Sequence, residues 1–313
     1  MGNGTATPKA AYLSLGLPEL RARAERALEG LARCVVCARA CLVDRTAGPS
    51  GFCRTGRYAR VSSFFPHFGE ETPISGHRGS GTIFFSGCNL DCVYCQNFEI
   101  SHGDEGREVT DSQLAAMMLS LQEMGCHNVN LVSPSHVVPQ FLAALAPAVE
   151  AGFRLPIVYN TGGYDSLPTL RLLDGIVDIY MPDAKYDDDR TAERLSGIRN
   201  YVRVNRLALK EMHRQVGDLQ LDDAGIAVRG LLVRHLVLPN GMAGTPGVVR
   251  FLARQLSTDT YVNVMPQYHP CYRAAEFRGL GRRITREEYE EALSAARSAG
   301  LRRGLPGSPS SHT

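Results

Sequence analysis

The sequence lacks three features that would point to a membrane, nucleic-acid-binding or secreted protein. It has no run of about 18 consecutive apolar residues, so no segment is long enough to form a membrane-spanning helix. It lacks an excess of one charge, because 34 basic residues stand against 32 acidic ones, and we therefore expect neither nucleic acid nor a membrane as a partner. Residues 1–5 lack the basic and then apolar pattern of a secretory signal, which predicts a cytoplasmic protein.

Cysteine is the most informative residue type that is present. Nine of the 313 residues are cysteine. A chain of this length can bury its own hydrophobic core without a disulfide framework, and in a reducing cytosol clustered thiols are more often metal ligands than disulfides. Seven of the nine cysteines fall into two groups, an upstream group of Cys34, Cys37, Cys41 and Cys53, and a second group of Cys88, Cys92 and Cys95.

The second group has the spacing C-x3-C-x2-C, which places three thiolates on one loop. Three ligands are one short of a closed structural zinc site, and also one short of a fully ligated four-iron cluster. A cluster held by three thiolates leaves one iron open, and an open coordination position is typical of a catalytic site. The alternative is that a fourth ligand comes from elsewhere in the chain and that the site is structural.

The upstream group has the spacing C-x2-C-x3-C-x11-C and allows three interpretations. Four cysteines in short pairs suit a closed tetrahedral zinc site. They also suit a second iron–sulfur cluster that serves electron transfer or substrate ligation. The third interpretation is that the group binds no metal.

Strand patterns alternate with helix patterns along the chain. The strand-like segments are short and rich in β-branched residues, whereas the helical segments place apolar residues at helical spacing. Six strand–helix units predict an α/β fold with a parallel sheet wrapped by helices. We predict strands at 81–85, 128–132, 156–159, 175–181, 226–238 and 260–265, helices at 114–121, 137–151, 167–173, 189–196, 202–216, 248–256 and 286–299, and a disordered tail at 304–313.

Polar residues gather where each predicted strand ends. In parallel α/β barrels the carboxyl ends of the strands form one rim, and sites are built there. We therefore expect the residues that end or follow successive strands to face one cavity. These residues are Cys88, Cys92 and Cys95 after the first strand, Ser133 after the second, Asn160 after the third, Asp183 and Lys185 after the fourth, and Arg234 on the fifth.

The segment 88–95 resembles the C-x3-C-x-φ-C signature of radical S-adenosylmethionine (SAM) enzymes, with Tyr94 as the aromatic residue φ. The wider chain, from about residue 34 to about residue 275, resembles the Fe–S branch related to pyruvate formate-lyase activating enzymes. This resemblance implies a partial (β/α)6 TIM-like barrel, which we place at 66–303. The upstream group departs from the resemblance, because the best-known pyruvate formate-lyase activating enzymes do not carry it, and we assign residues 1–65 to a cysteine-rich metal-binding extension. The supporting stretches are 41–45, 179–186, 234–239 and 265–268.

The resemblance also implies cofactors and a reaction. Cys88, Cys92 and Cys95 are expected to hold a [4Fe–4S] cluster whose open iron binds SAM. Reductive cleavage of SAM would give a 5′-deoxyadenosyl radical that abstracts a hydrogen atom from an unknown substrate, as in an oxidoreductase. The most specific form of this reaction is activase-like abstraction from a protein glycine, and the looser form acts on a small molecule or peptide. The expected partners are a low-potential electron donor of the flavodoxin or ferredoxin type and a protein substrate. A non-catalytic Fe–S electron-transfer or cluster-sensing protein is the alternative.

The resemblance assigns further residues to SAM binding. Tyr94 would lie against the adenine. Arg234 would contact SAM, because a guanidinium suits a carboxylate, or it would pair with a structural carboxylate instead. Asn160, Asp183 and Lys185 match positions near SAM, and an internal Asp183–Lys185 ion pair is the alternative. Many radical SAM enzymes carry Gly-Gly-Glu after the second strand, where this chain has Ser133 followed by Pro-Ser-His, so Ser133 would supply an acceptor without the charge of a carboxylate.

Overall fold

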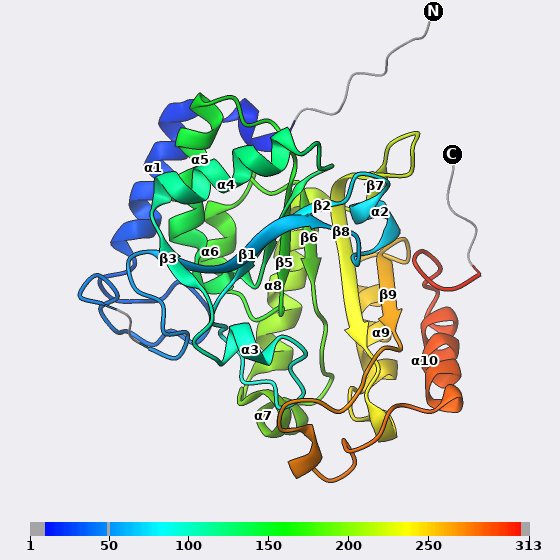
Figure 1. Cartoon of the computed structure of the whole chain (residues 1–313). Coiled ribbons are helices and arrows are strands. Elements are labelled where there is room, and N and C mark those ends of the chain that lie inside the picture. Colours follow the sequence, from blue (N-terminus) through cyan, green and yellow to red (C-terminus); the bar gives the residue numbers. More distant parts are fainter. Residues whose placement is uncertain (1–9, 49–50, 308–313) are drawn as a thin grey trace, which may run out of the picture.

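The computed structural model describes residues 10–48 and 51–307 and shows a mixed α/β fold around a nine-stranded sheet (Figure 1). Six strands of this sheet pair in parallel, in the order β2, β4, β5, β6, β8 and β9. Their bounds are β2 Ser80–Phe85, β4 Val129–Val132, β5 Ile157–Thr161, β6 Ile179–Pro182, β8 Ala227–Leu236 and β9 Tyr261–Met265. The prediction of a parallel sheet is confirmed, because each predicted strand overlaps one of these six.

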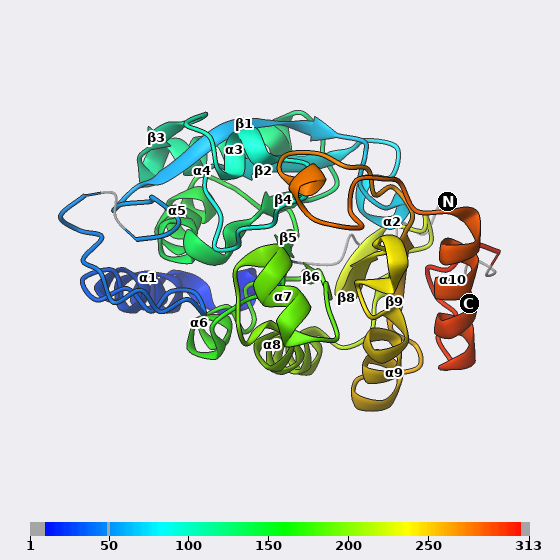
Figure 2. The ribbon, with the colours of Figure 1, turned by 90° about the horizontal axis from the view of Figure 1, so that it is seen from below.

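Helices follow each parallel strand, as the alternating pattern predicts. They are α4 (Asp111–Glu123), α5 (Val138–Glu150), α6 (Leu167–Leu172), α7 (Asp189–Ser196), α8 (Tyr201–Val216), α9 (Thr245–Gln255) and α10 (Arg286–Ser298). Figure 2 shows the sheet as an open curve with α4, α5, α6, α8 and α9 on its outer side. The main hydrophobic core lies between the sheet and these helices and includes the fully buried Leu131, Phe141, Leu145 and Ile157. Among the described residues, no helix is long and apolar enough to cross a membrane.

Two antiparallel strands that the sequence analysis did not predict extend the sheet beyond β2. They are β1 (Ala59–His67), which pairs with β2, and the short β3 (Arg107–Val109), which pairs with β1. Pro66 lies within β1, and proline is normally confined to edge strands and bulges, so this segment gave a weak strand pattern. The predicted boundary between the extension and the barrel, at residues 65 and 66, lies inside β1. Residues 59–65 therefore belong to the same sheet as the barrel strands.

The N-terminal segment also packs against the body of the protein. Helix α1 (Gly16–Glu29) lies beside α5, and the ring of Tyr12 stacks on that of Phe153 with 5.8 Å between centroids. At the other end, Leu305 is buried in the main core, so residues 304–307 of the predicted tail are not free of the fold. Residues 308–313 of that tail lie outside the described residues. The remaining elements are α2 (Thr72–Ser75), α3 (Phe98–Ser101) and β7 (Gln220–Leu221).

The start of α4 is set by a capping box. The Thr110 hydroxyl accepts the N–H of Gln113 at 3.2 Å, and the Gln113 side chain accepts the N–H of Thr110 at 2.8 Å. Two backbone donors that the helix leaves unpaired are satisfied in this way.

We predict that Thr110→Ala lowers the free energy of unfolding by about 1 kcal/mol, because the Gln113 N–H loses its acceptor. Chemical denaturation monitored by circular dichroism measures this loss. Thr110→Ser keeps the hydroxyl and is expected to retain most of the stability. An equal loss in both variants would show that the methyl group, and not the cap, stabilises this position.

Candidate metal and cofactor site

The loop 86–97, which we call the cysteine loop, begins where β2 ends and carries Cys88, Cys92 and Cys95. It turns at Gly87, whose φ is 80° and whose missing side chain leaves room for the backbone of Cys53; a Cβ atom here would lie 2.4 Å from the Cys53 carbonyl oxygen. The loop is then fixed to the end of α7, because the N–H of Asp91 donates to the Ser196 carbonyl at 3.1 Å. The neighbouring Val93 N–H donates to Leu195 at 3.0 Å.

Each sulfur of the cysteine loop has a hydrogen-bonding neighbour. The hydroxyl of Ser196 lies 3.0 Å from Cys92 Sγ. The hydroxyl of Ser101 lies 3.2 Å from Cys95 Sγ. Cys88 Sγ accepts the N–H of Leu90 at 3.4 Å. Hydrogen bonds to ligand sulfurs raise the reduction potential of an iron–sulfur cluster, and these donors are therefore suited to tuning one.

One cavity of about 540 Å³ collects the residues that the sequence analysis expected at the rim. The expected residues that line it come from the ends of four parallel strands and from the cysteine loop. This set comprises Cys88, Cys92, Tyr94, Cys95, Ser133, Asn160, Asp183, Lys185 and Arg234. The parallel sheet explains this convergence, because all carboxyl ends of its strands lie at one edge.

The cavity is rich in buried charge. The Lys185 ammonium donates to Asp183 Oδ2 at 2.6 Å. Burial alone would lower the pKa of Lys185, but attraction to Asp183 and Cys92 outweighs burial, and the pKa lies well above its usual value. Burial also raises the pKa of the Cys88 thiol to about 12 and that of Cys92 to about 11. Metal binding at these thiols must therefore release protons.

Arg234 contacts carboxylates of the protein itself. Its guanidinium donates to both oxygens of Glu71, at 2.8 and 2.6 Å, and to Glu70. Asn160 accepts from Arg234 Nη1 at 3.3 Å, so two residues expected near SAM contact each other. Burial opposes ionisation of Glu71, but Arg234 prevails and holds the pKa of this carboxyl below its usual value. The structure therefore shows Arg234 in the arrangement that we gave as the alternative, paired with carboxylates in the cavity wall.

Glu70 and Glu71 are cavity residues that the sequence analysis missed. They follow β1 and lie 8% and 7% exposed against Arg234. Asn130 and Asn263 donate to Glu70 and Glu71 at 2.9 and 2.7 Å. The two adjacent acids carry no spacing signal, and their role became visible only when β1 was placed beside β2.

Tyr94 lies in the cavity wall and is nearly fully buried. Its hydroxyl hydrogen bonds with that of Tyr186, which in turn lies 2.7 Å from the Ser196 hydroxyl beside Cys92. The ring of Tyr94 meets that of Tyr268 edge to face, 6.0 Å between centroids. This packing fixes the orientation of Tyr94 next to the cysteines, and an adenine contact for its ring stays a prediction.

The segment that stands in place of Gly-Gly-Glu divides between two environments. Ser133 adopts a left-handed conformation with φ 59° and lines the cavity. Ser135 instead contacts the Thr161 hydroxyl at 2.8 Å, and His136 is buried with its Nε2 3.0 Å from the Ser86 carbonyl oxygen. Ser133 is thus the member of this segment that is placed to meet a ligand.

The upstream group of cysteines lines a separate cavity that Asn89 of the cysteine loop also borders. All nine cysteines are free thiols. Within residues 10–48 and 51–307, no three histidine, cysteine, aspartate or glutamate side chains are arranged so that they could hold a single metal ion. The upstream group is thus brought together around one space, although its sulfur atoms do not converge on one point.

Comparison with known proteins assigns the class. A model of the radical SAM superfamily matches residues 82–215. The "Uncharacterized protein MJ0674" of Methanocaldococcus jannaschii is 32% identical over 275 residues, which cover 86% of this chain and 75% of the relative. The chain belongs to the radical SAM superfamily.

Two solved structures are also similar. One is a radical SAM methyltransferase from Sphaerobacter thermophilus, with a TM-score of 0.48 and 17% identity over 71% of this chain and 64% of that structure. The other is HydG, a maturase of the [FeFe]-hydrogenase, with a TM-score of 0.47 and 13% identity over 68% of this chain and 48% of that structure. The chain thus spans less than two thirds of each.

Membership of this superfamily implies a [4Fe–4S] cluster and SAM as cofactors, and the residues present fit such a group. The donor set is three thiols on one loop, each with a hydrogen-bonding neighbour, at the wall of a cavity that continues past them. Three thiolates hold a four-iron cluster and leave one iron for a second ligand. The chain is therefore a radical SAM iron–sulfur enzyme in general terms, and its substrate is a separate question.

Burial of His136 predicts a pH-dependent stability. Burial, assisted by Arg45, lowers the pKa of His136 to about 4 from its usual 6.5. Between these two values the unfolded chain binds a proton that the folded chain does not, so stability falls as pH falls.

Between pH 7 and pH 5 the free energy of unfolding of the wild type is expected to fall by about 2 kcal/mol more than that of His136→Gln, because glutamine does not titrate. Urea denaturation at the two pH values measures this difference. The amide of glutamine can still donate to the Ser86 carbonyl, which preserves the local contact. Equal losses in the wild type and in the variant would show that His136 is not the titrating group.

Proposed function

We propose that this protein cleaves SAM reductively and uses the resulting radical to abstract a hydrogen atom from a substrate, in the manner of pyruvate formate-lyase activating enzymes. The supporting observation is one cavity in which the three thiols of the cysteine loop meet polar side chains from the ends of successive parallel strands. We further propose that the curved sheet of Figure 2 is a partial (β/α)6 barrel, preceded by a cysteine-rich metal-binding extension. A protein glycine is the proposed substrate, and the cytoplasmic location stays a prediction.

The chain's own residues would position the cofactors. Cys88, Cys92 and Cys95 would hold the cluster. Lys185 places a buried positive charge near these thiolates, which favours their deprotonated form. Ser133 and Asn160 offer acceptors and donors to the amino-acid part of SAM. The cluster, once bound, supplies the electron that breaks a C–S bond of SAM.

Arg234 would bind SAM only by changing partners. Its guanidinium is already satisfied by Glu70 and Glu71, and a carboxylate that replaced either of them would leave a buried acid unpaired. We therefore assign Arg234, Glu70 and Glu71 to the wall that faces the substrate. Their ion pairs hold these three polar side chains in fixed positions there. Asn160 connects this wall to the SAM side of the cavity.

Oxygen-free protein, reconstituted with iron and sulfide and given SAM and a low-potential reductant, is expected to release 5′-deoxyadenosine and methionine. The variant Cys88→Ala/Cys92→Ala/Cys95→Ala should lose this activity together with about four irons. Liquid chromatography of the products and iron analysis measure the two effects.

Two outcomes would count against this function. A wild-type protein that holds iron but never cleaves SAM, even with glycine-containing peptides, would favour the electron-transfer alternative. A cluster whose fourth iron already has a protein ligand, as seen by Mössbauer spectroscopy, would exclude SAM binding at that iron.

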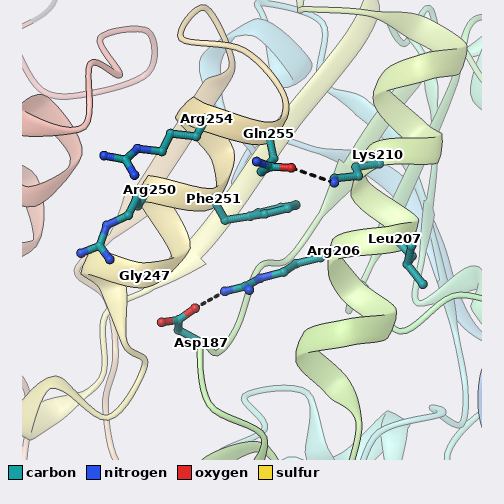
Figure 3. Close-up of a pocket in the computed structure, with 9 residues that line it drawn as sticks. All are labelled: Asp187, Arg206, Leu207, Lys210, Gly247, Arg250, Phe251, Arg254 and Gln255. Carbon is teal, nitrogen blue, oxygen red and sulfur yellow. Dashed lines mark hydrogen bonds and ion pairs between the residues drawn. The ribbon is translucent and has the colours of Figure 1, made fainter.

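The electron donor that we propose has an acidic docking face. A groove of about 600 Å³ between α8 and α9 is lined by Arg206, Lys210, Arg250 and Arg254, against one acid, Asp187 (Figure 3). Arg206 pairs with Asp187, and Lys210 donates to Gln255 at 2.9 Å. Arg250 and Arg254 are exposed on α9 and point away from these pairs. Asp187 lies two residues beyond Lys185, which lines the cysteine cavity.

We predict that Arg250→Glu/Arg254→Glu slows cluster reduction by an acidic flavodoxin-type donor about tenfold at low salt, because charge steers association. Reduction by dithionite should not change, since a small reductant needs no docking face. Stopped-flow absorbance measures both rates. The control Arg33→Glu/Arg171→Glu makes the same charge change at exposed positions outside the groove. Equal slowing in both double variants would exclude a specific docking site.

A further inference from the structure

The upstream group of cysteines has contacts that its sequence spacing does not reveal. We propose that Cys34, Cys37, Cys41 and Cys53 form a second metal centre, held by four thiolates, and that this centre braces the cysteine loop. Its charge would be balanced by two arginines. The proposal does not depend on SAM cleavage, because it concerns metal binding at different residues.

The backbone brings the four thiols to one cavity. The N–H of Cys34 donates to the Val43 carbonyl at 2.9 Å, and the N–H of Leu42 donates back to Cys34 at 3.0 Å, which closes a tight loop around Cys37 and Cys41. Ala40 and Leu42 adopt left-handed conformations in this loop, with φ 45° and 59°. Non-glycine residues are strained there, and such strain is concentrated at functional sites. Cys53, which comes later in the chain, lines the same cavity as the other three cysteines.

Arg45 is a buried cation, and within the described residues its hydrogen-bond acceptors include no carboxylate. It is 1% exposed. Its guanidinium donates to the carbonyl oxygens of Thr55 at 2.7 Å, His136 at 2.8 Å and Gly56 at 3.3 Å, and Nη1 lies 3.7 Å from Cys34 Sγ. A buried charge is costly unless an opposite charge accompanies it. A metal bound by Cys34 and its three partner cysteines would place that negative charge beside Arg45.

Arg39 is the second arginine that lines this cavity. Its Nε donates to the Asn89 carbonyl at 2.6 Å, and its guanidinium lies over the ring of Phe52, 3.4 Å from the centroid. Its Nη2 is buried and has no hydrogen-bond partner within the described part of the chain. This nitrogen lies near Gly197, where an added Cβ atom would be 3.8 Å from it, and Arg39 also lines the cavity of the four thiols, so the charge of its guanidinium would attract an anionic centre there. Arg39 and Arg45 together would balance the net negative charge that four thiolates leave around a divalent zinc ion or a four-iron cluster.

The same residues connect this centre to the cysteine loop. Arg39 holds the carbonyl of Asn89, which is the neighbour of Cys88. The Cys53 carbonyl packs against Gly87, the other neighbour of Cys88. A metal centre here would thereby restrain both chain neighbours of Cys88, Gly87 through Cys53 and Asn89 through Arg39. Zinc and an iron–sulfur cluster share this chemistry, and in either case binding would draw the four sulfur atoms together.

Metal analysis of the full chain tests the centre. The variant Cys88→Ala/Cys92→Ala/Cys95→Ala removes the ligands of the first cluster. After oxygen-free reconstitution it is expected to keep either about one zinc ion or about four irons with sulfide per chain. Inductively coupled plasma mass spectrometry and absorbance spectra distinguish the two. Adding Cys41→Ser, at a half-exposed position, should abolish this retention, whereas adding Cys126→Ala, a core cysteine outside both groups, should not.

A folded triple variant that retains neither metal would overturn the second centre. Circular dichroism of the same sample shows whether it is folded. SAM cleavage plays no part in this measurement, so the two proposals can fail separately.

A second variant tests whether the upstream metal centre supports the cysteine loop. Arg39→Gln removes one balancing charge and the contact with Asn89, and is expected to speed metal release from the upstream centre to a chelator about tenfold, in line with the loss of other outer-sphere partners. It should also broaden the electron paramagnetic resonance spectrum of the reduced first cluster, because Cys88 loses its support. Arg33→Gln, a nearby exposed arginine, is the matched control. A normal spectrum despite faster release would show that the centre does not brace the loop.

Discussion

The constraint on which the rest of the structure depends is that three thiols must be held at fixed positions on an irregular loop. Loops have few backbone hydrogen bonds of their own, and the cysteine loop takes its order from neighbours. It starts at the end of β2, a strand buried on both sides, and is fixed to the end of α7 by the N–H groups of Asp91 and Val93. Gly87 and Asn89 connect it to the upstream segment. The sheet, a helix and the N-terminal segment thus converge on one loop.

Buried charge gives the cavity its second property. Arg234 with Glu70 and Glu71, and Lys185 with Asp183, form ion pairs whose side chains are only 7–23% exposed. Removing one partner of such a pair typically costs about 3–5 kcal/mol, because the other charge stays buried and unpaired. The pairs therefore keep their geometry, and a ligand that enters must either leave them intact or offer an equivalent charge. This condition restricts the ligands that the wall accepts.

The six strand–helix units were predictable because their patterns are local. β4 (Val129–Val132) is buried at every position, as a central parallel strand must be, and the capping box of Thr110 marks the start of α4 within the sequence itself. β1 was not predictable in the same way. Its pattern is interrupted by Pro66, and its place in the sheet depends on pairing with β2, which the sequence around it does not encode. The boundary predicted at residues 65 and 66 failed to follow the fold for that reason.

The sequence by itself determined which side chains gather at the site, because three cysteines at a spacing of three and two must lie close together on any loop, and strand-end polar residues in a parallel sheet must share one edge. Only the tertiary structure decided the partners of each charge. Arg234 meets Glu71 across 163 positions of sequence, and Arg39 meets Asn89 across 50. Such contacts depend on how distant elements pack, and the residues involved carry no local pattern. A buried charge pairs with the opposite charge or carbonyl group that folding places beside it, so its partner is visible only in the tertiary structure.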